Sequence, residues 1–139
     1  MKASQLLLPT LLTLISLQVN AGSLSVGDNL TIESVNGKLV NAQQIQLDEG
    51  IHMVALRFSD FYVINAEDSS WVRSDPLFTR VKVKAGEQLE LNTSPLFSEE
   101  DARAFLQAPQ VNVQSNKRPD GQQVLMSQVQ LITQLFQEK

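Results

Sequence analysis

An Asn-Gly pair set within alternating sequence is the feature that most constrains the fold of this chain. Residues 30–35 alternate between apolar and polar side chains, and Asn36-Gly37 follows them directly. A two-residue hairpin turn of type I′ needs a positive φ at both central residues, which Asn followed by Gly adopts readily. Residues 38–40 then return as the second strand. The pattern therefore predicts an antiparallel hairpin in the first third of the chain.

Further segments along the chain alternate between apolar and polar residues, and turns that contain glycine separate them. The strand expected at 52–58 is the most apolar, with Val54, Leu56 and Phe58 on its core face beside His52. Residues 77–84 and 89–91 are expected to form a further hairpin. This rhythm is typical of antiparallel sandwiches, and it predicts a mainly β, antiparallel sandwich-like domain. The other strands are expected at 23–26, 44–47, 61–65 and 71–73, with alternation resuming at 111–113.

Two segments are expected to be helical. Ser98 precedes three acidic residues, an arrangement that caps a helix N-terminus and suits its dipole, and Pro109 ends the helix. Near the C-terminus, the apolar residues Leu125, Val129, Ile132 and Phe136 recur at helical spacing. We therefore expect one short helix and a C-terminal helix, although Val129 could also belong to a strand.

The N-terminus carries the pattern of a cleavable signal peptide. Lys2 precedes an apolar run over residues 6–17, which is too short to cross a bilayer. Small side chains stand at Val19 and Ala21, the −3 and −1 positions of a cleavage site before Gly22. We expect residues 1–21 to be a signal peptide and residues 22–139 to form a single domain. Cleavage would leave no stable membrane insertion.

Composition narrows the compartment and the partners. The sequence contains no cysteine, whereas small secreted animal domains commonly depend on disulfides, so we expect a bacterial periplasm. The formal net charge is −4, which disfavours nucleic acid as a partner because phosphate backbones attract basic proteins.

The residues needed for most catalytic chemistry are missing from the sequence. With no cysteine and one histidine, the usual zinc sites and a cysteine nucleophile are excluded. The sequence contains neither a Gly-x-Ser-x-Gly elbow nor a glycine-rich phosphate loop. His52 is expected to be a hydrogen-bonded packing residue. We expect no enzyme activity, no catalytic residue, no metal and no cofactor.

The best candidate for a binding patch is aromatic. Five of the eight aromatic residues fall between positions 58 and 78, where they could form a core or line a patch for a ligand or partner. Phe61, Tyr62 and Trp71 are the candidates. Arg80 and Lys82 project from one side of the strand expected at 77–84, where they could protect a free sheet edge or meet an acidic partner.

The order of several short motifs resembles a known family. The motifs are residues 35–40, 47–52, 57–58, 74–76 and 100–106 with Pro109. Together they are similar to an uncharacterised family of exported proteobacterial proteins that contains the enterobacterial curli-synthesis inhibitor, and the hairpins also resemble PEGA-type β-sandwich modules. The resemblance implies a periplasmic, non-enzymatic protein that affects assembly of extracellular amyloid fibres.

Three functional hypotheses follow. In the first, an unpaired sheet edge binds a secreted fibre subunit by strand addition. In the second, the region of Tyr62 and Trp71 binds a small ligand, as in a sensor or carrier protein. In the third, the domain is an accessory module that binds another envelope protein within a larger complex.

Overall fold

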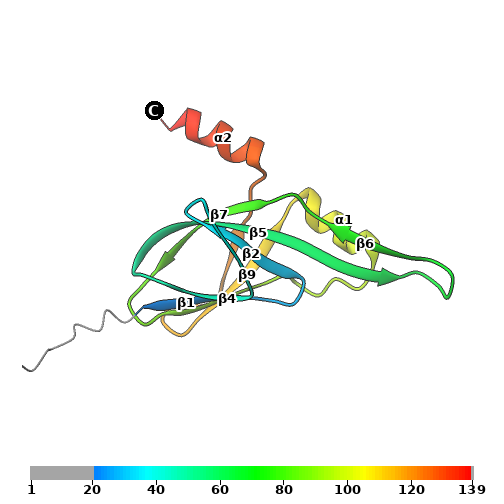
Figure 1. Ribbon diagram of the computed structural model, residues 1–139, viewed down its shortest axis with the longest axis horizontal. Coiled ribbons are helices and arrows are strands. Elements are labelled where there is room, and N and C mark those ends of the chain that lie inside the picture. Colours follow the sequence, from blue (N-terminus) through cyan, green and yellow to red (C-terminus); the bar gives the residue numbers. More distant parts are fainter. Residues whose placement is uncertain (1–20, 139) are drawn as a thin grey trace, which may run out of the picture.

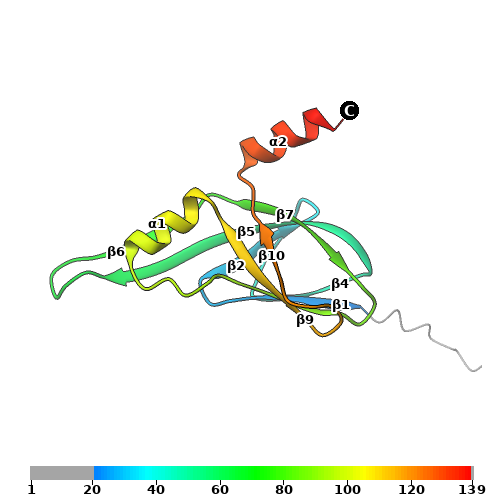
Figure 2. The same cartoon turned by 180° about the vertical axis from the view of Figure 1, so that it is seen from behind.

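The computed structural model of the chain describes residues 21–138, so the expected signal peptide lies outside the described residues apart from Ala21. Figures 1 and 2 show the arrangement of its elements from opposite sides. In chain order these are β1 (Gly22–Val26), β2 (Leu30–Val35), β3 (Lys38–Ala42), β4 (Gln44–Leu47), β5 (Gly50–Val63), β6 (Ser69–Arg73), β7 (Leu77–Val83), β8 (Gln88–Asn92), α1 (Glu99–Gln107), β9 (Gln110–Ser115), β10 (Gly121–Val124) and α2 (Gln128–Gln137).

The strands form two sheets, which confirms the predicted fold class. The first sheet has the order β10-β9-β8-β1-β4, and the second has the order β3-β2-β5, with β6 and β7 pairing with β5. One pairing differs from the antiparallel expectation, because β1 and β8 run parallel with Ser23 opposite Gln88. The first sheet is therefore mixed rather than purely antiparallel.

The Asn-Gly hairpin forms as predicted. Asn36 has a φ of 53° and Gly37 a φ of 82°, and Val35 pairs with Lys38 across the turn. After this hairpin the chain passes from the second sheet to the first within a single residue, since only Gln43 separates β3 from β4. The Gln43 side chain donates a 2.6 Å hydrogen bond to the Leu30 carbonyl. The Gln43 carbonyl accepts one of 3.0 Å from the Val26 amide. This residue therefore ties the two sheets together.

The expected hairpin between residues 77–84 and 89–91 is wrong. β7 pairs with β5 in the second sheet, whereas β8 pairs with β1 and β9 in the first. The turn between them redirects the chain, because the Glu87 carboxylate accepts the Lys84 amide at 3.0 Å. The Glu87 carbonyl then accepts the Ser23 amide at 2.8 Å. These contacts place β8 beside β1 instead of beside β7.

Strand β5 is longer than the sequence predicted, since it continues through Ser59 to Val63 as one strand of 14 residues. Ser59 lies between the strands expected at 52–58 and 61–65, and its amide donates a 2.9 Å hydrogen bond to the Asn29 carbonyl. On the opposite edge, Ser74 bonds the backbone of Phe58 through both its amide and its hydroxyl. β7 and β6 therefore follow one another along the same edge of β5, and the β5–β6 hairpin extends beyond the body (Figure 1).

The core lies between the two sheets, and α1 covers one end of it. Val54, Leu56 and Phe58 are fully buried, as the alternation of β5 predicted. From α1, Ala102 is buried, and the Phe105 ring lies 5.2 Å from that of Phe58. Their buried partners from the first sheet and from β2 are Leu24, Leu30, Ile32, Leu89, Leu91 and Val111.

His52 is only partly buried, and both of its ring nitrogens have partners. Nδ1 lies 3.0 Å from the Asn36 side-chain amide, and Nε2 lies 2.7 Å from the Asp48 carbonyl oxygen. The imidazole thus joins the turn after β2 to the turn before β5. The structure confirms the predicted hydrogen bonding of this histidine, but its ring lies at a partly exposed position rather than within the core.

The C-terminal helix forms, but its predicted apolar stripe is not buried. Val129 is 74% exposed and Phe136 72% exposed, whereas Leu131 is buried. Leu125 is also buried, but it precedes the helix N-cap, Ser127, and therefore does not belong to a helical stripe. Figure 1 shows α2 projecting away from the sheets. Within residues 21–138, no helix has the length and apolarity needed to span a membrane.

Gly22 offers a sharp test of the packing where β1 begins. A Cβ at this position would lie 2.3 Å from Val83 Cγ1 and 2.8 Å from the Glu87 carbonyl oxygen. Forced overpacking of this kind costs about 1–3 kcal/mol. We predict that Gly22→Ala lowers the free energy of unfolding by about that amount in urea titrations. Gly121→Ala is the matched control, since its Cβ would meet nothing within 4 Å. Equal effects of the two substitutions would contradict this packing.

Candidate binding groove

The distal part of β5 has one edge without a strand partner. Opposite β6, the Ile64 amide donates to the Asp68 carbonyl and the Ser74 amide to the Phe58 carbonyl. Along a strand, the N–H and C=O groups of successive residues point to opposite edges. Because Phe58 and Ile64 both bond toward β6, the backbone groups of the even-numbered residues of this part of β5 point toward β6. The backbone groups of odd-numbered residues therefore point to the opposite edge.

That opposite edge is paired by β2 only as far as Phe58, which lies opposite Leu30. Beyond it, no strand that the structure describes pairs with the edge of Phe61 and Val63. The Phe61 amide is held by the adjacent Asp60 carboxylate at 2.9 Å. The carbonyl groups of Phe61 and Val63 and the Val63 amide point outward along this edge.

A groove of about 760 Å³ runs beside this edge. Its other wall is the segment of residues 96–100, which leads from β8 into α1. No backbone hydrogen bond joins the two walls within the described part of the chain. The groove is lined by Asp60, Phe61, Tyr62, Val63, Ile64, Leu96, Phe97, Ser98, Glu99 and Glu100.

Phe97 stands out on the second wall, because its side chain is 87% exposed. It precedes the N-cap Ser98, a position where an apolar residue commonly packs against the fourth residue of the helix. That fourth residue is Ala102, whose methyl group is too small to cover a phenyl ring. Phe97 was not among the residues selected from the sequence. The signal that could have found it is a large apolar residue before the helix cap with only an alanine at the fourth helical position to cover it.

The groove carries negative charge. Asp60 accepts hydrogen bonds from the Phe61 amide and, at 3.0 Å, from the Tyr62 hydroxyl. Burial and the Asp60 carboxylate raise the pKa of Tyr62 to about 12, so the phenol stays neutral. Arg103 pairs with Glu99 at 2.5 Å, and its hydrogen bond lowers the pKa of that carboxyl. Glu100 has no ion pair with any residue that the structure describes.

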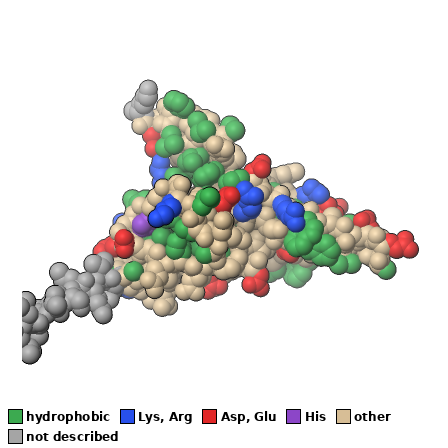
Figure 3. All heavy atoms as spheres, in the orientation of Figure 1, with side chains coloured by type: hydrophobic (Ala, Val, Ile, Leu, Met, Phe, Trp, Pro, Cys, Tyr) green, Lys and Arg blue, Asp and Glu red, His purple; other side chains and the backbone are tan. Residues whose placement is uncertain are grey.

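The residues predicted to form one patch lie in three separate places: Phe61 with Trp71, Tyr62 by itself, and Arg80 with Lys82. The rings of Phe61 and Trp71 lie 5.1 Å apart on the outer face of the hairpin, and the Arg73 guanidinium lies 4.9 Å from the Trp71 ring centre. Tyr62 points to the opposite face and is only 8% exposed. The structure therefore brings Phe61 and Trp71 together but does not bring Tyr62 to them. Figure 3 shows apolar side chains gathered on the outward-facing hairpin and on α2.

Arg80 and Lys82 lie elsewhere. They project from β7 opposite Met53 and Ile51 of β5, far along the sheet from Phe61. Arg80 forms an ion pair with Glu138 at 3.4 Å. These two basic residues therefore do not join the aromatic pair in one patch.

The outer edge of β7 is covered rather than free. The Phe78 carbonyl accepts the Met126 amide at 2.8 Å. Further along, the Arg80 carbonyl accepts from the Gln123 side chain, and the Lys82 carbonyl accepts from Arg118. Alternate carbonyls of this edge are thus occupied by the segment that contains β10. The sequence suggested that Arg80 and Lys82 could protect a free sheet edge, but the edge of β7 is not free.

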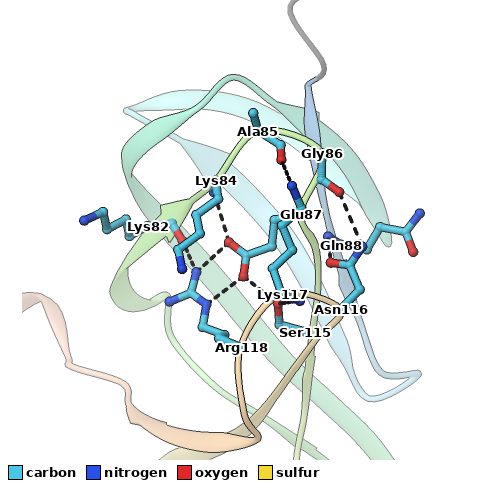
Figure 4. Close-up of polar contacts among 10 residues, drawn as sticks. All are labelled: Lys82, Lys84, Ala85, Gly86, Glu87, Gln88, Ser115, Asn116, Lys117 and Arg118. Carbon is cyan, nitrogen blue, oxygen red and sulfur yellow. Dashed lines mark hydrogen bonds and ion pairs between the residues drawn. The ribbon is translucent and has the colours of Figure 1, made fainter.

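An ion pair between the buried Glu87 and the partly exposed Arg118 holds that segment in place (Figure 4). Glu87 is fully buried, and its carboxylate accepts from Arg118 Nε and Nη2, both at 2.7 Å, and from Ser115 Oγ at 2.5 Å. The Arg118 hydrogen bonds, assisted by Ser115 and the Lys84 amide, lower the pKa of Glu87 from 4.5 to about 2. The carboxylate is surrounded by donors that belong to the fold, so this cluster is structural. Sequence reasoning treated Glu87 only as a turn residue.

Residues 23–139 match a family described as an uncharacterized protein conserved in bacteria, DUF2057. The chain belongs to this family. No curated protein and no solved structure matches the chain. The DUF2057 match runs from β1 to α2 and includes both walls of the groove. Within residues 21–138, no group of three or more His, Cys, Asp or Glu side chains could hold a metal ion.

We predict that Arg118→Ala destabilises this DUF2057 protein strongly, because it leaves the buried Glu87 carboxylate without its partner. Breaking a buried ion pair costs about 3–5 kcal/mol. Arg57→Ala is the matched control, since the Arg57–Glu33 pair is exposed and such pairs contribute about 1 kcal/mol or less. Chemical denaturation at neutral pH measures both. Equal losses would contradict the structural role of Glu87.

The same carboxylate predicts a pH dependence. Its pKa is about 2 in the folded chain and 4.5 without its partners. The stabilisation is therefore complete above about pH 4.5 and is lost as the pH falls toward 2. In Glu87→Gln, the free energy of unfolding should change less steeply across this pH window than in the parent chain. An unchanged slope would show that Glu87 is not the titrating group.

Proposed function

We propose that this protein is a non-enzymatic periplasmic protein of the bacterial envelope that binds an extended segment of a secreted protein subunit. The binding mode is strand addition to the open edge of β5 at Phe61 and Val63. The observation that carries the proposal is the coincidence of an unpaired strand edge with a groove beside it. An edge of this kind offers outward backbone donors and acceptors, which supply the affinity in strand addition.

The groove provides room for such a segment. Its volume of about 760 Å³ falls within the range of roughly 300–1,000 Å³ that is usual for ligand clefts. The apolar side chains of Ile64, Leu96 and Phe97 line it and can pack against alternate residues of an added strand. The edge is short, which fits reversible capture of a segment rather than growth of an extended sheet.

Export is part of the proposal. The N-terminal pattern of residues 1–21 supports a cleavable signal peptide, and β1 begins at Gly22, directly after the proposed cleavage site. Removal of the peptide would therefore leave every described strand and helix intact. The resemblance to proteins that include the curli-synthesis inhibitor supports a role in modulating curli-type fibre assembly. Fibre growth depends on free strand edges, so capture of an unfolded subunit would slow it.

We predict that substoichiometric amounts of the protein lengthen the lag time of fibre formation by a curli-type subunit, and that Val63→Pro removes most of this effect. Proline at this position deletes the outward amide of β5 without deleting a hydrogen bond to β6. Thioflavin fluorescence measures the lag time. Val63→Thr is the control, because it keeps both the amide and the β-branched shape. An unchanged lag time with the parent chain, or full activity of Val63→Pro, would contradict the proposal.

A second candidate function rests on the outer aromatic pair. Phe61 and Trp71 present two adjacent, tilted rings to solvent, with 44% and 54% of their surfaces exposed, and Arg73 lies over Trp71. Exposed aromatic rings of this kind suit a planar or apolar small ligand, as in a sensor or carrier protein.

Trp71 is the single tryptophan of the chain and therefore reports directly on this candidate. If a small ligand binds there, a fractionated envelope extract should quench Trp71 emission in a saturable way. Mass spectrometry should then detect a bound compound that Trp71→Ala fails to retain. Equal retention by Trp71→Ala would exclude this function.

A further inference from the structure

We infer that the groove selects segments in which cationic and apolar side chains alternate. This inference rests on the proposed strand addition and specifies the chemistry of the partner. In a sheet, residues opposite one another on adjacent strands project to the same face. The two faces of an added strand would therefore meet different surroundings, which are set by the alternation of β5.

The inner face of the added strand would meet acidic surroundings. Asp60 and Tyr62 project to this face, and Asp60 has no ion pair with any residue that the structure describes. The first turn of α1 adds Glu99 and Glu100 to the lining of the groove, and Asp101 follows them in the same turn. Arg103 compensates Glu99 alone. No lysine or arginine lines the groove.

The N-terminus of α1 does not reverse this sign. A helix N-terminus carries roughly half a positive charge, which favours anions. Residues of the chain itself already satisfy this end of the helix, since the Ser98 hydroxyl accepts the Asp101 amide and three carboxylates occupy the first turn. Asp101 also accepts the Phe97 amide at 3.0 Å. The net charge presented to an incoming segment remains negative.

The outer face of the added strand would meet apolar surroundings. Phe61 and Val63 project to this face, and both are substantially exposed. An aromatic or β-branched side chain opposite them would form the cross-strand pairs that stabilise sheets. A segment with Lys or Arg at every second position and apolar residues between them satisfies both faces at once.

Three designed peptides test the inference, alternating Val with Lys, Val with Gln, or Val with Glu. We expect the Lys peptide to bind at least ten times more tightly than the Gln peptide at low salt, with the Glu peptide weakest. The difference should shrink to less than about threefold in 1 M salt, where the screening length is about 3 Å. Fluorescence anisotropy of labelled peptides measures each affinity.

Paired variants separate the groove from the overall charge of the protein. Asp60→Asn with Glu100→Gln should reduce the preference for Lys over Gln to about threefold or less. Glu90→Gln with Asp120→Asn, two exposed acids outside the groove, should leave the preference unchanged. Equal loss in the two double variants would overturn the inference, because attraction to net charge alone would then explain it.

The remaining outcomes distinguish this inference from the proposed function. If all three peptides bind the parent chain equally and Val63→Pro abolishes their binding, the charge preference is wrong and strand addition stands. If the Lys peptide binds Val63→Pro as tightly as it binds the parent chain, strand addition at this edge is wrong. If no peptide binds the parent chain, both fail.

Discussion

The unequal pairing along the two edges of β5 determines much of this structure. One edge is matched first by β7 and then by β6, so that it is paired along nearly its whole length. The other edge is matched by β2 only as far as Phe58. The difference carries the β5–β6 hairpin beyond the core and leaves backbone groups without a strand partner beside α1. The candidate groove is a direct result of this mismatch in strand length.

The parts of the fold that were predictable depend on local chemistry. The Asn36-Gly37 turn and the Ser98 cap are decided by residues close together in the sequence, and both form as predicted. Alternation likewise identified the buried face of β5. Sheet membership was harder, because β8 follows β7 directly and yet pairs with β1. Nothing in the alternation of β8 distinguishes a parallel partner from an antiparallel one.

The candidate site was predictable only in part, for a related reason. Phe61 and Trp71 meet because they lie opposite each other on neighbouring strands. Tyr62 could not join them, since adjacent residues of a strand face opposite sides. Phe97 contributes to the groove from a segment with no periodic pattern. Glu87 resembled an ordinary turn residue, and its burial depends on Arg118, which is 31 positions away.

The parallel pairing of β1 with β8 has a consequence for how the chain folds. Ser23 meets Gln88, a residue 65 positions further along, so the two strands must close a long loop before either gains from the contact. Pairings with this separation form slowly compared with local hairpins. The β2–β3 hairpin and the antiparallel pairing of β1 with β4 can assemble early, whereas the parallel pairing of β1 with β8 must wait for most of the chain. The junction between β1 and β8 is therefore expected to be among the last pairings to form, so a chain threaded through a membrane from its N-terminus would reach the other side before its first sheet closes.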